Sequence, residues 1–177
     1  MENPLVWIDL EMTGLDIKND LIIEIAVIIS DSQMKNFITG PEIIIYQPSI
    51  IMDNMNDWCK KTHGESGLTQ KVKDSNNSMK EVEKQVLDFI KLHIPEPCKG
   101  ILAGNSIHID RQFLLKDMPL ITDHLHFRII DVSSIKELVK NWYPELPLFK
   151  KKWGHRALDD IKESIDELKY YRKYAFK

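Results

Sequence analysis

Two acidic residues interrupt the first apolar segment of this sequence, the run LVWIDLEMTG that begins at Leu5. Asp9 and Glu11 lie two residues apart, so on a β-strand both side chains project from the same side of the sheet. Placing two carboxylates together on a core strand is costly unless a cation neutralises them. The spacing therefore indicates a metal site, with a solvated strand end as the simpler alternative for the pair taken alone.

Two further acids are expected close to helix starts. Asp110 comes soon after the apolar segment ILAG, and Asp160 falls in the first turn of the last expected helix. Four carboxylates without a cysteine ligand favour Mg²⁺ or Mn²⁺ over zinc, and two such ions can promote an in-line phosphoryl displacement. His155, five residues before Asp160, can accept a proton from an attacking water near neutral pH, whereas a lone histidine there would more simply be a surface residue.

The apolar patterning predicts an antiparallel opening followed by alternating strands and helices. Ser78 and Glu81 have the spacing of a capping box at the start of one helix, and Ser133 and Ser134 are expected to cap another. This order predicts an α/β fold in which helices cover a mixed sheet. We expect strands at residues 5–12, 21–30, 37–46, 101–104 and 127–132, and helices at 54–61, 79–93, after 106, 135–142 and 157–174.

Length and composition predict one soluble domain spanning residues 1–177. The chain is 43% hydrophobic and 29% charged, and its apolar runs are too short to cross a bilayer, so no membrane is expected. Residues 1–4 lack the basic start of a targeting segment, which favours the cytoplasm. Two cysteines cannot form a disulfide framework, and a formal charge of -3 argues against a protein that grips long nucleic acid. Any polyanionic substrate is expected to be short.

Several motifs together resemble the DEDDh 3′-to-5′ exonucleases, and among them the oligoribonuclease family, from Leu5 to about Leu168. The matching segments are WIDLEMTGL, THGESGL, LAGNSI, DRQFL, IIDVSSIKEL and GHRALDDIKESIDEL. The resemblance implies a ribonuclease H-like mixed five-stranded sheet flanked by helices. It also implies a homodimer that degrades short single-stranded RNA, from dinucleotides to a few nucleotides, to 5′-mononucleotides. Asp9, Glu11, Asp110 and Asp160 would hold two Mg²⁺ or Mn²⁺ ions, and His155 would be the general base.

The resemblance also implies substrate-binding residues, several of which have a structural alternative. Leu15 would wedge between two bases or else pack on the core, and Trp58 would stack on a base or else fill the core. His63 would contact the substrate. Asn105 and Ser106 would reach a phosphate or else cap a helix. Arg128 would bind a 5′-phosphate across the dimer, although the family's His-Tyr-Arg stretch reads His126-Phe127-Arg128 here.

Other charged residues are interpreted as structural. Glu24, Asp131 and Asp159 are not expected to be metal ligands, and the lysines at residues 150–152 are expected in a solvated loop that steers anions. Two other functions remain open: a related nuclease that trims longer RNA or DNA, and a non-catalytic module that binds oligonucleotides. The intact acid set argues against a pure binder, which has no use for four mutually repelling carboxylates.

Overall fold

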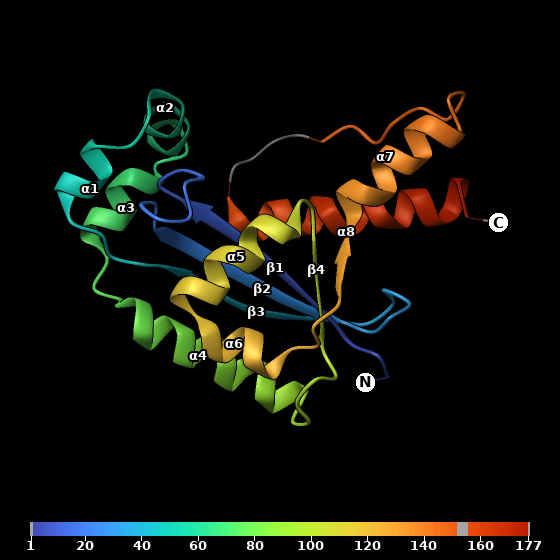
Figure 1. Ribbon diagram of the computed structural model, residues 1–177, viewed down its shortest axis with the longest axis horizontal. Helices are drawn as coiled ribbons and strands as arrows, with labels where there is room; N and C mark the ends of the chain where they lie inside the picture. Colours follow the sequence, from blue (N-terminus) through green and yellow to red (C-terminus); the bar gives the residue numbers. More distant parts are fainter. Residues whose placement is uncertain (1, 152–155, 177) are drawn as a thin grey trace.

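A five-stranded mixed sheet forms the centre of the protein, with helices on both faces (Figure 1). The computed structural model describes residues 2–151 and 156–176. The strand order is β3-β2-β1-β4-β5, which confirms the predicted α/β fold with a mixed sheet. The strands are β1 (Leu5–Met12), β2 (Ile22–Ser30), β3 (Phe37–Ile44), β4 (Ile101–Gly104) and β5 (Ile129–Asp131).

Strand β1 lies at the centre of the sheet and carries the first two candidate ligands. It pairs antiparallel with β2 and parallel with β4, so both of its edges are hydrogen-bonded. Asp9 lies opposite Ala26, and Glu11 lies opposite Glu24. All nine residues of β2 are buried, and only Glu24 and Ser30 among them are polar, so the carboxylates of β1 adjoin a neighbour that is shielded from water. A buried position of this kind raises the cost of ionising both acids.

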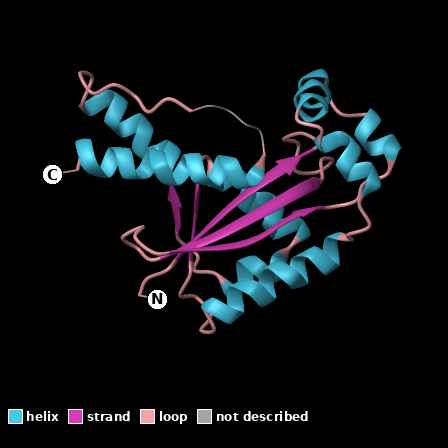
Figure 2. Cartoon of the chain, turned by 180° about the vertical axis from the view of Figure 1, so that it is seen from behind, coloured by secondary structure: helices cyan, strands magenta, loops and turns pink. Residues whose placement is uncertain are grey.

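The alternation of β1 divides its side chains between two cores. Val6, Ile8 and Leu10 belong to the larger core, which packs under α4 (Met79–His93), α5 (Ile107–Asp117) and α6 (Pro119–His124). Leu5 and Trp7 belong to the opposite core, which is covered by α7 (Val132–Trp142) and α8 (Ala157–Tyr174). Figure 2 shows the two helical layers on either side of the sheet. Asp9 and Glu11 follow Trp7 at alternate positions, and they therefore project toward α8.

Helix starts show where local sequence signals succeed and fail. The capping box predicted for α4 is present, because the Ser78 hydroxyl accepts a hydrogen bond from the Glu81 amide and the Glu81 carboxylate accepts one from the Ser78 amide. The helix predicted at residues 135–142 is present as α7, but its predicted start and cap were wrong. This helix begins at Val132 rather than 135, and its cap is Asp131, which accepts a hydrogen bond from the Ser133 amide. An aspartate is as good an N-cap as a serine.

Three short helices replace the single helix predicted at residues 54–61. They are α1 (Ser49–Asp53), α2 (Asp57–Glu65) and α3 (Leu68–Asp74), and they lie together at one end of the sheet (Figure 1). Asn56 caps α2 by accepting a hydrogen bond from the Cys59 amide, and Gly67 provides a left-handed backbone between α2 and α3. Among the described residues, no helix is long and apolar enough to cross a membrane.

Candidate active site

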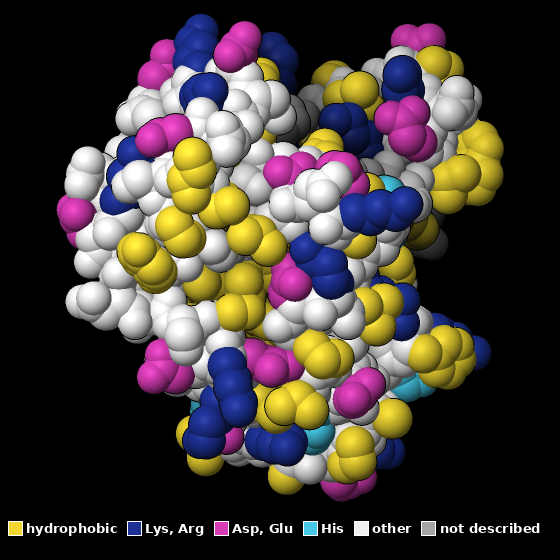
Figure 3. All heavy atoms as spheres, turned by 60° about the vertical axis from the view of Figure 1, so that its left-hand side comes forward, with side chains coloured by type: hydrophobic (Ala, Val, Ile, Leu, Met, Phe, Trp, Pro, Cys, Tyr) yellow, Lys and Arg dark blue, Asp and Glu magenta, His cyan; other side chains and the backbone are white. Residues whose placement is uncertain are grey.

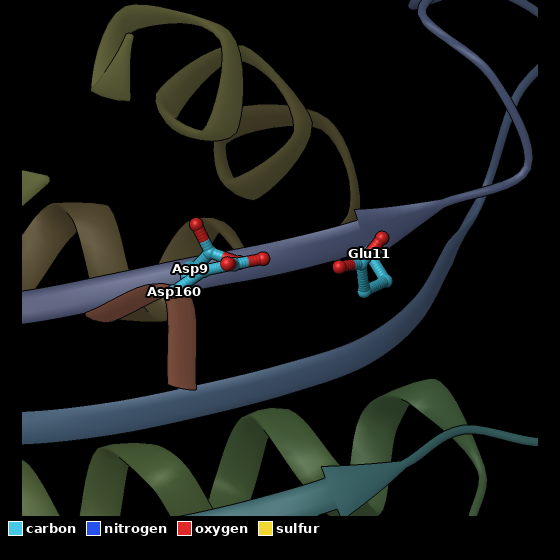
Figure 4. Close-up of side chains that lie close together, drawn as sticks. All are labelled: Asp9, Glu11 and Asp160. Carbon is cyan, nitrogen blue, oxygen red and sulfur yellow. The ribbon is translucent and has the colours of Figure 1, made fainter. Parts of the chain in front are cut away.

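Three carboxylates meet where the first turn of α8 faces β1. One oxygen atom from each of Asp9, Glu11 and Asp160 lies within 4.8 Å of the others (Figure 4). Asp9 and Glu11 come from the same side of β1, and Asp160 comes from a helix about 150 residues later in the chain. The structure thus brings together three of the four predicted metal ligands. We call these three residues the acidic cluster.

Asp110, the fourth predicted ligand, lies beside the acidic cluster. Its buried side chain accepts a hydrogen bond from the backbone amide of Leu10, at 3.0 Å between Oδ1 and N. It is not one of the three residues whose oxygens converge within 4.8 Å. Its negative charge nevertheless contributes to the raised pKa of Asp9. The bond to Leu10 fixes Asp110 against β1, between the two acids of that strand.

Burial and mutual repulsion raise the pKa values of these acids. The pKa of Asp9 lies well above its usual value, because of burial first and then because of the charges of Asp110, Asp160 and Glu11. Burial and the charge of Asp160 raise the pKa of Glu11 to about 8, and burial raises the pKa of Asp110 to about 7. A divalent cation would relieve this repulsion, and buried oxygen ligands without sulfur suit Mg²⁺ or Mn²⁺. The donor set therefore fits such a metal.

A buried ion pair anchors the start of α8 and hence Asp160. Glu24 on β2 is fully buried, and Arg156 binds it through Nη2 and Nε, with Nη2 to Oε1 at 2.6 Å and Nε to Oε2 at 3.2 Å. Glu24 also accepts a hydrogen bond from the Ala157 amide at the first residue of α8. The interpretation of Glu24 as structural agrees with these contacts. His155, the predicted general base, lies outside the described residues.

The sequence interpretation did not identify Arg156. The signal was available: Glu24 interrupts the otherwise apolar strand β2, and a buried carboxylate requires a cationic partner or a proton. The interpretation of residues 150–152 as a solvated loop was wrong for Lys151. This side chain is largely buried, its Nζ lies 3.4 Å from Oε2 of buried Glu167, and its charge lowers the pKa of Asp9. Lys151 therefore moderates the repulsion in the acidic cluster.

A cavity of about 410 Å³ adjoins the acidic cluster and shares Glu11 with it. Leu15 is 71% exposed and Trp58 is 62% exposed, so the alternatives that placed them in the core were wrong. Both side chains line the cavity and can meet a ligand there. The space-filling view shows the molecule from the side of α1, α2 and α3, where hydrophobic side chains gather around a hollow (Figure 3). The cavity is lined by Leu10, Glu11, Met12, Gly14, Leu15, Asn56, Trp58, Cys59 and His63.

His63 joins the cavity wall to the strand that carries the acids. Only 1% of this residue is exposed, and its Nε2 donates a hydrogen bond to the Met12 carbonyl oxygen at 2.9 Å. Its Nδ1 lies 3.8 Å from Oε2 of Glu11. The structure therefore brings His63 to the edge of the acidic cluster, and the imidazole fixes α2 against the end of β1.

The remaining predicted binding residues do not line this cavity. The Asn105 amide donates hydrogen bonds to Ser164 and Glu167 of α8, so its contacts are internal. Ser106 occupies the N-cap position of α5, but its hydroxyl makes no capping bond and lies 3.1 Å from the Ser133 hydroxyl. Arg128 is exposed and packs over the ring of Phe127, with its guanidinium carbon 5.0 Å from the ring centroid.

The two other acids that were interpreted as structural also lie outside the acidic cluster. Asp131 caps α7 and accepts hydrogen bonds from the Ser106 amide and from Nδ1 of His108. Asp159 is exposed and forms an ion pair with Lys162 at 3.0 Å. The carboxylates of Asp131 and Asp159 are therefore stabilised by hydrogen bonds and an ion pair outside the acidic cluster.

Comparison with known proteins supplies independent information. A family model described as Exonuclease matches residues 6–168. The chain is 53% identical to a probable oligoribonuclease of Dictyostelium discoideum, over 98% of this chain and 90% of the relative. It is 52% identical to the mitochondrial oligoribonuclease of Bos taurus, over all of this chain and 75% of the relative. The fold is similar to that of E. coli exonuclease I solved with a dT13 oligonucleotide, with a TM-score of 0.71 at 13% identity, covering 96% of this chain and 41% of the other.

Proposed function

Because the chain belongs to the oligoribonuclease family of exonucleases, we propose that it removes 5′-mononucleotides from the 3′ ends of short single-stranded RNA. The observation that carries this proposal is the junction of the acidic cluster with the cavity at Glu11. A phosphodiester at the cluster places its terminal nucleotide within reach of the exposed side chains of Leu15 and Trp58. Substrates of two to a few nucleotides match the small cavity.

The acids would hold the catalytic metal. Asp9, Glu11 and Asp160 are the ligands favoured by their convergence, and Asp110 is a fourth ligand adjoining them. We propose that they hold two Mg²⁺ or Mn²⁺ ions. Such ions, when bound, lower the pKa of water and neutralise charge that develops at a phosphoryl group. This chemistry explains why a folded protein keeps buried carboxylates whose ionisation opposes folding.

One side chain takes up the proton of the attacking water, and others hold the acids in place. His155 accepts this proton as the water oxygen bonds to phosphorus; the P–O3′ bond breaks, and the departing 3′-oxygen takes up a proton from solvent to leave the shortened chain. Arg156 and Glu24 fix the start of α8, so that Asp160 stays opposite β1. His63 fixes the end of β1 through its hydrogen bond to Met12. Each of these contacts limits movement of the carboxylates.

Contacts to the bases and phosphates determine the substrate class. Trp58 stacks on one base, which contributes about 1–3 kcal/mol when the stacking is complete. Leu15 lies between the two terminal bases, and His63 closes the cavity beside them. Ser106 supplies a phosphate contact while Asn105, already bonded to α8, holds the Ser106 turn in place. The space-filling view supports short substrates, because the coloured Lys and Arg side chains on that face are scattered among acids rather than aligned (Figure 3).

Assembly and location are further parts of the proposal. The enzyme acts as a homodimer of single exonuclease domains, in which Arg128 from one subunit binds the 5′-phosphate at the other subunit's site. Exposed Phe127 and Trp142 support such a contact, since large apolar side chains on a surface favour association. We place the enzyme in the cytoplasm. Sedimentation of the purified protein tests the dimer, and cell fractionation tests the location.

A dinucleotide assay tests the activity. Purified protein with Mg²⁺ or Mn²⁺ is expected to convert a 5′-labelled RNA dinucleotide to mononucleotides, and EDTA is expected to stop the reaction. Asp160→Asn is expected to lose at least a hundredfold in kcat, because it removes a ligand charge at the acidic cluster. Asp166→Asn, on an exposed turn of the same helix, is the matched control and should retain full activity. Absence of turnover by wild-type protein with either metal would refute the proposed function.

A further inference from the structure

The side chain of Asp20 helps to hold the loop that carries Leu15. This loop covers residues 13–21 and connects β1 to β2, at the same end of the sheet as α2 (Figure 1). Leu15 is strongly exposed, so its own packing cannot fix its position. If Leu15 has a defined position at the cavity, contacts of the loop backbone must hold it there.

Asp20 accepts hydrogen bonds from the start and from the middle of the loop. Its Oδ1 accepts from the Thr13 hydroxyl at 2.8 Å, and its Oδ2 accepts from the Asp16 amide at 2.8 Å. Thr13 is buried, and its Oγ1 accepts in turn from the Leu21 amide at 3.1 Å. These bonds join the residue at the end of β1, the residue after Leu15 and the residue before β2.

The backbone around Asp20 is fixed from a second direction. The Asp20 amide donates to the Asp16 carbonyl oxygen at 2.8 Å, and Nζ of Lys116 on α5 donates to the Asp20 carbonyl oxygen at 2.6 Å. The loop is thus attached to a helix of the main core as well as to its own two strands. A side chain carried on such a loop has little freedom to move away from the cavity.

Gly14 shows how closely the Asp20 carboxylate approaches the residue before Leu15. A Cβ atom at position 14 would overlap Cγ and both carboxylate oxygens of Asp20. The carboxylate cannot retreat without losing its bonds to Thr13 and Asp16. Only glycine therefore allows Asp20 to close the loop in this form.

We propose that Asp20 is a positioning residue that holds Leu15 between the bases of the substrate and so favours substrates that offer two adjacent bases. This inference rests on the proposed function, because it needs Leu15 to meet substrate. Asp20 does not belong to the acidic cluster and does not itself line the cavity, although its carboxylate lies against Gly14, which does. Its effect is therefore expected on substrate selection, and the reaction at the phosphate should stay intact.

Two substrates separate positioning from general damage. The first is an RNA dinucleotide, and the second is the same molecule with an abasic 5′ sugar, which offers Leu15 only one base. Asp20→Ala is expected to lower kcat/KM for the dinucleotide about tenfold, as Leu15→Ala does, since either change removes the contact of one leucine side chain that the bound bases would bury. Both variants should cleave the abasic analogue within twofold of wild type. The double variant should be no worse than Leu15→Ala alone.

Conservative and control variants complete the test. Asp20→Asn keeps the shape of the side chain and can still form hydrogen bonds with Thr13 and with the Asp16 amide. It should therefore retain most of the wild-type rate on the dinucleotide, which Asp20→Ala loses. Gly14→Ala should reproduce the Asp20→Ala defect by displacing the carboxylate. Asp123→Ala, on the exposed surface of α6, should leave both substrates unaffected. Equal losses on both substrates, or an unchanged dinucleotide rate for Asp20→Ala, would overturn the proposal.

Hydrogen exchange keeps this test separate from the proposed function. The amides of Asp16 and Leu21 should exchange at least tenfold faster in Asp20→Ala, because the first loses its acceptor and the second loses the fixed Thr13 hydroxyl. This readout needs no substrate. Unchanged exchange in Asp20→Ala would overturn the role of Asp20 even if wild type is active. Faster exchange in Asp20→Ala, together with a wild type that cleaves no dinucleotide, would refute the proposed function and leave Asp20 as a loop anchor only.

Discussion

Replacing Glu11 by glutamine should stabilise the metal-free protein while abolishing its activity. Glu11 is a buried carboxyl whose pKa rises to about 8, from an ordinary value of 4.5. A raised carboxyl pKa means that the folded state holds the proton more tightly than the unfolded state. The contribution of this group to the free energy of unfolding is therefore fully present below pH 4.5, and it is lost as the pH rises toward 8. Glutamine carries no charge and removes this loss.

The size of the effect follows from the pKa shift. Between pH 4.5 and pH 7, ionisation of this one group costs about 1.4 kcal/mol per pH unit, or about 3 kcal/mol at pH 7. At pH 5 the cost is below about 1 kcal/mol. For a domain of this length, about 3 kcal/mol corresponds to a rise in Tm of roughly 6–12 °C. The carboxyl is mostly buried, with 13% of its side chain exposed, so solvent screening is small.

Thermal unfolding in EDTA measures this directly. Glu11→Gln should exceed wild type in Tm at pH 7, and the difference should shrink at pH 5. Glu137→Gln, an exposed glutamate on α7, should change Tm by less than about 2 °C at either pH. With added Mn²⁺ the Tm of wild type should exceed that of Glu11→Gln, because the metal stabilises only the protein that binds it. A variant no more stable than wild type at pH 7, or a difference independent of pH, would refute the reasoning.

Three other substitutions test separate parts of the structure. Arg156→Met leaves buried Glu24 without its cation, so the free energy of unfolding should fall by about 3 kcal/mol in a denaturant titration. Trp58→Ala removes an exposed ring from the cavity, and should raise KM for a dinucleotide about tenfold while Tm stays within 2 °C. Trp7→Phe removes the buried hydrogen bond from Nε1 to the Ser30 hydroxyl and leaves a cavity in the core, and should cost about 1–3 kcal/mol of stability without changing kcat. Unchanged stability in Arg156→Met or Trp7→Phe, or unchanged KM in Trp58→Ala, would contradict the corresponding role.

Local patterns in the sequence predicted the framework of the site. The alternation of β1 placed Asp9 and Glu11 on one side of the sheet, and the capping box marked the start of α4. Both signals act over a few residues, so a single sequence contains them in full. The last helix, which carries Asp160, was likewise predicted at residues 157–174 and begins at Ala157 in the structure.

Contacts between distant segments could not be predicted in the same way. Arg156 and Glu24 are 132 residues apart, and only the folded chain pairs them. The lysine run at residues 150–152 has the composition of a solvated loop, yet the Lys151 ammonium group lies beside the carboxylate of buried Glu167 on α8. Trp58 lies on one of three short helices that pack around a small core of their own, which includes Met52 and Leu68. Helices this short have no long apolar stripe in the sequence, so the exposure of Trp58 could not be predicted from such a pattern.

The most direct test of the proposed function is a length series on 5′-labelled RNA, from dinucleotide to about twelve nucleotides, with saturating Mn²⁺. The acidic cluster adjoins a small cavity that Leu15 helps to line, so we expect no further site there for bases beyond the first two or three. We expect kcat/KM to be highest for the dinucleotide and to fall by at least tenfold over the series. Equal or rising values with length would contradict an enzyme built for very short RNA, and would favour one that trims longer chains.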